Sequence, residues 1–451
     1  MRLLFTIAII AALSLSLAGC DGIVDDAKDP INSASDEELN DPGQIGFLVD
    51  GVQARWNNVH DNMTVQASLL SDQIVFGGSI GGGATFPTFN QINQGQIRLD
   101  NNSVGTTESH LGQYRFLADD LLRRIDQANI DSDEARFIGN FHGGLARYYY
   151  ATYFGLSQRE GGGVITTLDS PADTDRGSFV PSDQLYDDAI QRLTTALDFA
   201  PSDYDVRVIN SVIARIELFR DNLEAAEAAA RDGLAEGDLP FRAEYIELSG
   251  NQQNTWQSQG GPGRTQVVAS PKYWLDPRFE DDVFLDQAGL TAGGSAGLTE
   301  RLRTRPLVRI PLWPAVLSNL GGAIDNGFPL AQGLYLQNDD PINFITWQEN
   351  NLTLAEIELR LNDNEADALE LVNAVRNFRE LDTFDEIDLN RLFQERETEL
   401  FATALRLPDQ RRVEMFDLDV DPELHGWHLG DGTWWYLPIT EDERLNNPNV
   451  D

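Results

Sequence analysis

Apolar positions recur along this chain with the period of amphipathic helices, and the helices they predict come in pairs. The first pair spans 111–128 and 134–154, with a short polar break between the two helices. The second pair spans 182–199 and 207–219, and Ser182 stands where a helix N-cap is expected. The remaining predicted helices span 221–234, 347–361, 364–379 and 389–405.

Small residues occupy close-packing positions of these helices, and each pair has the length of a tetratricopeptide unit, roughly 30–40 residues. These small residues are Ala214, Ala225, Ala226 and Ala229. The strict consensus of that repeat is absent from the sequence. We therefore predict a mainly α fold, a tetratricopeptide-like helical-repeat superhelix built from about 43–73, 109–239 and 343–407.

Three long stretches lack a helical period, at about 74–108, 155–181 and 240–342. They are rich in Gly, Asn and Pro, yet they carry aromatic residues, in which disordered segments are poor. Ordered loops of such length in a compact protein usually serve a function. We therefore predict a large loop-rich, ligand-binding subdomain laid over the helical scaffold.

Residues 1–19 have the pattern of a lipoprotein signal peptide. Arg2 precedes an apolar run over 3–17, and Leu17-Ala18-Gly19-Cys20 forms a lipobox. Cleavage before Cys20 would free its thiol and amine for acylation, and two or more acyl chains anchor a protein stably. The alternative, a transmembrane helix followed by a chance cysteine, needs a longer apolar run.

The predicted mature chain consists of an acidic tether over 20–42 and a domain over 43–451. Cys20 is the only cysteine, which excludes disulfides, thiol catalysis and cysteine-ligated metals. Asp21 directly after it retains some lipoproteins at the inner membrane, so the sequence leaves the final membrane open at this point.

The charge balance restricts the partners of this protein. Its 451 residues include 73 Asp and Glu against 33 Lys and Arg, for a net charge of −40. Such a surface repels phosphates, which excludes nucleic acid as a partner. Lysine is limited to Lys28 and Lys272, and an acidic, lysine-poor surface suggests a hypothesis of high external salt. A neutral ligand is expected over an anionic one, unless a local cluster of arginines binds it at Arg301, Arg303, Arg305 and Arg309.

Two groups of residues are candidates for chemistry. Glu395 and Glu399 share a helix face and could form an acid/base pair, but we favour an ion-pair network with nearby arginines. Those arginines are Arg396, Arg406, Arg411 and Arg412. His425 and His428 could bind a metal, but the glycines and proline around them favour a structural role in a loop. No P-loop and no nucleophile elbow is present, and we predict no cofactor and no metal.

Several sequence blocks, in this order, resemble SusD/RagB-like outer-membrane lipoproteins. The C-terminal blocks begin with Asn343-Phe344-Ile345-Thr346-Trp347-Gln348-Glu349 and end with Trp434-Trp435-Tyr436-Leu437-Pro438-Ile439. The others lie at 134–155, 354–356, 361–376 and 395–401. Together with the lipobox they span nearly the whole chain.

The resemblance implies a SusD-like domain in a non-catalytic lipoprotein of the outer-membrane surface. Such a protein captures an oligosaccharide or another nutrient and hands it to a SusC-like TonB-dependent barrel. The acidic stretch after Cys20 resembles the export signals of surface lipoproteins, which favours the outer membrane despite Asp21.

Aromatic rings that stack on sugars and amides that bind hydroxyls are the expected ligand-binding groups. In the loop-rich stretches these are Phe86, Phe89, Asn90, Trp256, Tyr273, Trp274 and Trp313. The alternative for each ring is that it packs its loop onto the helices. We expect Trp347, Trp434 and Trp435, which belong to the family-like blocks, to lie in the core.

Two other functions remain open. A periplasm-facing helical-repeat scaffold for protein assembly would have a free helical groove and no aromatic pocket. A lipid-anchored glycoside hydrolase would need two carboxylates about 5–10 Å apart across a cleft, and no pair in the sequence marks itself out.

Overall fold

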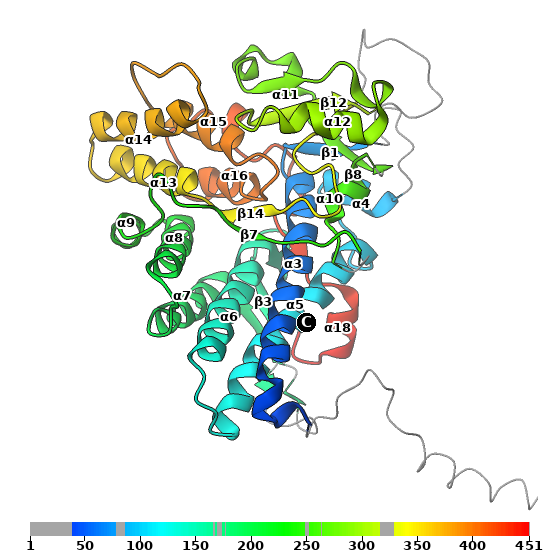
Figure 1. Ribbon diagram of the computed structural model, residues 1–451, viewed down its shortest axis with the longest axis vertical. Helices are drawn as coiled ribbons and strands as arrows, with labels where there is room; N and C mark the ends of the chain where they lie inside the picture. Colours follow the sequence, from blue (N-terminus) through cyan, green and yellow to red (C-terminus); the bar gives the residue numbers. More distant parts are fainter. Residues whose placement is uncertain are drawn as a thin grey trace, which may run out of the picture.

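The structure contains long helices, as the sequence predicts, and they are arranged around a central one, α3 (Ile45–Leu70) (Figure 1). The computed structural model describes residues 38–77, 86–165, 167–168, 174–175, 177–248, 252–262, 264–315 and 329–450. Cys20, the signal peptide and most of the tether lie outside these residues. Within the described part, no helix is both long and apolar enough to cross a membrane.

Side-chain caps set where the next helices begin. Asn101 accepts hydrogen bonds from the backbone N–H groups of Ser103 and Val104, so α5 (Asn102–Gln127) begins well before the predicted residue 111. Ser132 caps α6 (Asp133–Tyr153) in the same way. Helices α5 and α6 pack together and against α3, which makes the first predicted pair part of the core.

The second predicted pair forms α7 (Ser182–Leu197) and α8 (Asp203–Phe219), followed by α9 (Leu223–Arg231). The prediction that Ser182 is an N-cap is wrong: Pro181 occupies that position, and the Ser182 hydroxyl donates to the carbonyl of Ala151 at 2.7 Å. That bond ties α7 to α6. The two helices approach closely at Gly144, where an added Cβ would lie 2.9 Å from the Leu193 side chain.

The C-terminal helices are α13 (Trp347–Arg360), α14 (Glu365–Phe378), α15 (Leu389–Glu399) and α16 (Arg406–Met415). The helix predicted over 389–405 therefore ends early. Ala402 and Ala404 have φ of 59° and 76°, which no α-helix accommodates. The Ala402 N–H donates instead to the side-chain oxygen of Gln73, far away in the sequence.

Short strands join the loop-rich stretches to this scaffold. Strand β7 (Phe241–Ala243) pairs antiparallel with β14 (Ile342–Ile345), and β15 (Leu437–Pro438) runs parallel to β2 (Phe154–Gly155). The other pairings are β1 (Ile74–Phe76) with β10 (Val267–Ala269), β3 (Gly162–Val164) with β6 (Phe179–Pro181), β4 (Thr167–Leu168) with β5 (Thr174–Asp175), β8 (Gly260–Gly261) with β9 (Arg264–Thr265), and β12 (Ile310–Pro314) with both β11 (Val283–Leu285) and β13 (Leu330–Gln332).

Short helices punctuate the same stretches and the C-terminal tail. They are α4 (Pro87–Asn93), α10 (Thr255–Gln259), α11 (Lys272–Leu275), α12 (Gly294–Arg303), α17 (Pro422–His425) and α18 (Glu441–Asn446), with single 3-10 turns at Pro277–Phe279 and Gly289–Thr291. Two more 3-10 turns, Glu38–Asn40 and Pro42–Gln44, precede α3. The predicted architecture, a mainly α helical-repeat scaffold with a loop-rich part, is therefore confirmed (Figure 1).

Buried arginine–carboxylate pairs hold the C-terminal helices in the core. Glu395 pairs with Arg309 and Arg376, and Glu399 pairs with Arg379, so neither glutamate faces the other as an acid/base pair. Both glutamates therefore belong to ion pairs, but the expected partners are wrong, because none of the four predicted arginines pairs with either glutamate. Arg396 and Arg412 bind Asp409, Arg406 binds Asp72, and Arg411 donates to backbone carbonyls.

Candidate functional site

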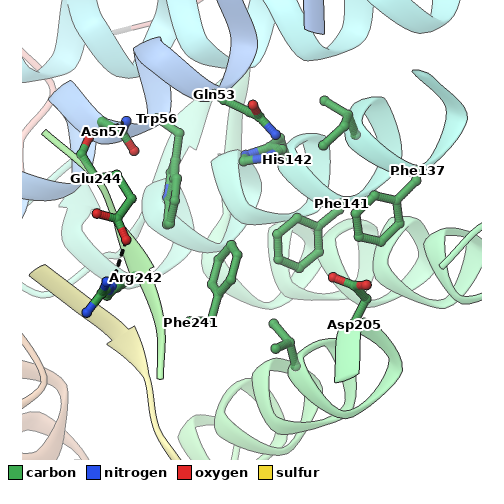
Figure 2. A pocket seen from close by; sticks show the side chains of 12 residues that line it. Gln53, Trp56, Asn57, Phe137, Phe141, His142, Asp205, Phe241, Arg242 and Glu244 are labelled. Atoms are coloured by element: carbon green, nitrogen blue, oxygen red, sulfur yellow. Dashed lines mark hydrogen bonds and ion pairs between the residues drawn. The ribbon is translucent and has the colours of Figure 1, made fainter. Parts of the chain in front are cut away.

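An aromatic-walled pocket of about 280 Å³ opens between α3, α6, α8 and β7 (Figure 2). Its wall consists of Trp56, Phe137, Phe141 and Phe241. Trp56 and Phe241 stack with their ring centroids 5.0 Å apart, and Phe141 meets Phe241 edge to face at 5.4 Å. The wall is therefore a continuous set of rings, of which Phe241 is half-buried and the other three are buried.

Each ring is placed by the element that carries it. Phe137 and Phe141 lie one turn apart on α6 and stack at 5.6 Å. The Trp56 indole N–H donates to the Tyr149 hydroxyl at 3.2 Å, which fixes the ring that α3 contributes. Phe241 is held opposite by the pairing of β7 with β14 and stays half-buried.

Polar side chains form the rim of this pocket: Gln53, Asn57, Asp205, Arg242 and Glu244. The Asn57 amide donates to the Glu244 carbonyl at 2.7 Å, and Arg242 pairs with the Glu244 carboxylate at 2.6 Å. An apolar wall with a few polar groups at its edge is typical of small-molecule sites.

The inner end of the pocket includes His142, which carries no charge at neutral pH. Burial lowers the pKa of this imidazole to about 3, and its Nδ1 lies 2.7 Å from the Tyr114 hydroxyl. A general acid or base needs a pKa near the working pH. The histidine is therefore suited to lining the pocket and not to proton transfer.

The structure places most of the predicted ligand-binding rings inside the core. Trp256 and Trp313 are 0% and 1% exposed, and their indole N–H groups donate to Thr64 and to the Gln332 carbonyl at 2.9 and 2.8 Å. Tyr273 is equally buried and donates to Glu397 at 3.2 Å. Phe89 is buried as well, and none of the four lines the pocket of Figure 2.

Phe86, Asn90 and Trp274 are partly exposed, and none of them lines the pocket of Figure 2. Phe86 lies edge to face with Phe89 at 5.8 Å and under the Arg264 guanidinium at 5.3 Å. A role for these residues in ligand binding stays a prediction.

The rings of the family-like blocks differ in burial. Trp347 is buried, as predicted. Trp434 and Trp435 are only partly buried, and Arg159 lies over the Trp435 ring at 3.6 Å.

Neither histidine candidate lies in a cluster of metal-ligating residues. Among the described residues, no group of three or more His, Cys, Asp and Glu is arranged to hold a metal ion. His425 is buried, which lowers its pKa to about 3, and the His428 ring contacts Trp427 at 5.4 Å.

A second pocket, of about 560 Å³, lies beside α18 and contains a partly buried carboxylate, Glu108. Its Oε2 accepts hydrogen bonds from the backbone N–H and the hydroxyl of Thr440. Burial raises the pKa of Glu108 to about 7, and the charge of Glu443 adds to the rise, while the Thr440 bonds oppose it. This carboxyl joins the C-terminal tail to α5.

The raised pKa predicts a pH-dependent effect of Glu108→Gln. The folded protein holds the proton more tightly than the unfolded chain, so this stabilising contribution is complete below about pH 4.5 and is lost as the pH rises through about 7. The variant keeps an oxygen for Thr440 and avoids that loss. We therefore compare the unfolding free energies of Glu108→Gln and the unchanged protein in urea. The variant's value minus that of the unchanged protein should rise from pH 5 to pH 8, by at most about 1.4 kcal/mol per pH unit.

The control for this measurement is Glu441→Gln, which removes an exposed carboxylate from the neighbouring helix α18. It should change the unfolding free energy little at either pH. A difference in unfolding free energy between Glu108→Gln and the unchanged protein that stays constant with pH would contradict the raised pKa of Glu108.

The fold has relatives among solved structures. Surface glycan-binding protein A from Bacteroides uniformis is similar with a TM-score of 0.65 and 13% identity, over 90% of this chain and 98% of that chain. A SusD superfamily protein from Bacteroides vulgatus matches with a TM-score of 0.64 and 12% identity, over 91% and 98% of the two chains. A laminarin-binding SusD-like protein matches with a TM-score of 0.65 and 15% identity, over the same shares.

These similarities extend over nearly the full length of both chains, although the identities are low. No protein-family model and no curated protein sequence matches the chain. The resemblance carried by the sequence blocks is thus confirmed by the fold of the 90–91% of the chain that these matches cover, and the chain has the SusD-like fold.

Proposed function

We propose that this protein is a non-catalytic carbohydrate-binding lipoprotein, and that the pocket of Figure 2 holds part of the carbohydrate. The observation that carries the proposal is the pairing of a half-buried ring, Phe241, with a rim of amide, carboxylate and guanidinium groups. Apolar ring faces complement the C–H faces of a sugar, and the rim groups complement its hydroxyls. Solved proteins of the same fold that are named for glycan or laminarin binding support the ligand class.

We further propose that the protein is anchored through Cys20 to the outer membrane, faces outward and works with a SusC-like TonB-dependent barrel. The lipobox and the SusD-like fold support this arrangement. In this role the protein captures its ligand and hands it to the barrel without changing it chemically. The strongly acidic chain makes a neutral carbohydrate a better ligand than an anionic one.

Replacing Phe241 with alanine tests the ligand-binding part of this proposal. The change removes the half-buried ring that stacks on Trp56 in the pocket wall, so a polysaccharide that retards the unchanged protein in affinity electrophoresis should bind the variant about tenfold more weakly. The panel comprises neutral starch, laminarin, xylan, galactomannan and levan. Gln53→Ala, an exposed change on the rim, should weaken binding to a smaller extent without disturbing the wall.

The matched comparison is Phe86→Ala, which removes a partly exposed ring of the loop-rich part. Affinity should stay unchanged in this variant. The opposite pattern is a loss of binding in Phe86→Ala and none in Phe241→Ala or Gln53→Ala. It would show that the carbohydrate binds at the loop-rich part and not in the pocket of Figure 2. No retardation by any polysaccharide of the panel would count against carbohydrate binding itself.

A further inference from the structure

We propose that the pocket of Figure 2 is one end of a groove that binds an unbranched, neutral oligosaccharide lengthwise, with a second aromatic platform at Phe378. This inference rests on the proposed function and extends it from the class of ligand to its shape and length. The segment 236–244, which joins α9 to β7 and includes that strand, lies along the groove.

The groove is inferred from three pockets that follow one another along the segment 236–244 and share lining residues. The pocket of Figure 2 shares Phe241, Arg242 and Glu244 with a pocket of about 540 Å³. That pocket shares residues 237–240 with a third one, of about 430 Å³. A single sugar fills only part of such a space, since pockets for whole drug-sized ligands measure roughly 300–1,000 Å³. The groove therefore suits a chain of linked sugars.

Phe378 supplies an exposed ring at the far end. It is the last residue of α14 and is 43% exposed, although a large apolar side chain is normally buried. Trp347 supports it from the core, edge to face at 5.4 Å. A ring that is backed by one aromatic side chain and open to a pocket can stack on a sugar without rearranging.

Polar groups beside Phe378 repeat the arrangement of the first pocket. Arg379 lies 5.4 Å from the Phe378 ring centroid and binds Glu399 through two hydrogen bonds, of 2.9 and 2.5 Å. Thr403 and Gln348 also line this end. Each end of the groove thus combines a ring with an arginine–glutamate pair. Between the ends, Leu239 is 75% exposed and Pro240 lies next to it, which gives the middle an apolar surface.

Acidic residues outnumber arginines along the groove, because Asp205 and Glu236 also line it. Arg207 binds Asp238 at 2.7 Å, Arg242 binds Glu244 at 2.6 Å, and Arg379 binds Glu399 at 2.5 Å. Every arginine that lines the three pockets is therefore paired with a carboxylate. An anionic chain finds no unpaired cation among these described residues, whereas paired guanidinium and carboxylate groups still donate to and accept from hydroxyls. This favours a neutral ligand.

The experiment compares chain lengths. Oligosaccharides from the disaccharide to the octasaccharide are prepared from the polysaccharide that binds most tightly in the neutral panel, and their affinities are measured by isothermal titration calorimetry. The unchanged protein should bind the longest chain about tenfold or more tightly than the shortest. Phe378→Ala should bind the shortest chain as well as the unchanged protein does, and should lose most of the gain with length.

Two further variants make the result specific. Leu239→Ala alters an exposed side chain in the middle of the groove and should reduce the same gain. Phe47→Ala removes a phenylalanine that is 65% exposed and lies outside the three pockets, and it should bind every length as the unchanged protein does. Thermal melts that match the unchanged protein confirm that the variants fold.

The outcomes separate this inference from the proposal on which it rests. Binding that does not strengthen with length, or a gain with length that survives both Phe378→Ala and Leu239→Ala, overturns the groove and leaves carbohydrate binding in place. If an anionic polysaccharide binds more tightly than every neutral one of the panel, the inference that the ligand is neutral is wrong. Absence of binding at every length overturns the proposed function and the groove together.

Discussion

Replacing Arg215 with methionine is expected to lower the free energy of unfolding by about 3–5 kcal/mol, because it leaves a buried carboxylate without its cation. The Arg215 guanidinium donates to both oxygens of Glu349 at 2.6 Å and to the carbonyl of Phe344, and it lies 4.6 Å from the Phe344 ring. Both charged side chains are almost completely buried, at 2% and 3% exposed. The measurement is urea unfolding followed by circular dichroism.

A double variant distinguishes an unpaired charge from lost packing. Arg215→Met combined with Glu349→Leu removes both charges and should recover most of the lost stability, because apolar pairs commonly replace buried ion pairs without loss. Arg98→Met, in the exposed pair with Asp100, should cause no measurable loss. A double variant no more stable than Arg215→Met alone would show that the single change acts through packing.

Replacing Trp256 with alanine is expected to cost about 3–5 kcal/mol of stability, since its fully buried ring would leave a large cavity. Trp256→Phe keeps most of the ring and loses the hydrogen bond to Thr64, which should cost roughly 1–3 kcal/mol. Thermal and urea unfolding measure both. Because the ring packs against Tyr335 at 5.7 Å inside the core, Trp256→Phe should leave carbohydrate affinity unchanged.

The same two variants test the role that the sequence suggests for this tryptophan. If Trp256→Phe weakens binding while its unfolding free energy stays within a few tenths of a kcal/mol, the ring contacts ligand as the sequence alone predicts. If it lowers stability and binds normally, Trp256 anchors α10 to α3 and has no direct part in the site.

Much of the helical scaffold could be predicted because its helices bury one regular face. The period of apolar residues in α7 or α14 is the direct consequence of that burial. The end of α15 could not be predicted, since the positive φ of Ala402 depends on a bond to Gln73 from another part of the fold. The short strands were missed for a related reason: two or three residues are too few to show an alternating pattern.

The candidate site was harder to predict than the fold. Trp56, Phe137 and Phe141 follow the helical period whether they face other side chains or a cavity, so the sequence does not distinguish the two. Phe241 joins them only through the pairing of β7 with β14. Conversely, aromatic residues in irregular segments look available for ligands. Trp256 and Trp313 are instead buried and donate hydrogen bonds to Thr64 and to the Gln332 carbonyl, and nothing in the sequence pattern predicts these two partners.

The contacts between the two ends of the domain also govern the order in which it can fold. Strand β15 lies beside β2, and Arg406 binds Asp72, which is 334 residues earlier in the sequence. Contacts of such long range form slowly, because a large loop must close before they contribute. A chain still emerging from a ribosome lacks the partners of Asp72 and β2, so its N-terminal helices remain incompletely packed during synthesis. The core of the domain can therefore close only after the C-terminal segment has been synthesised.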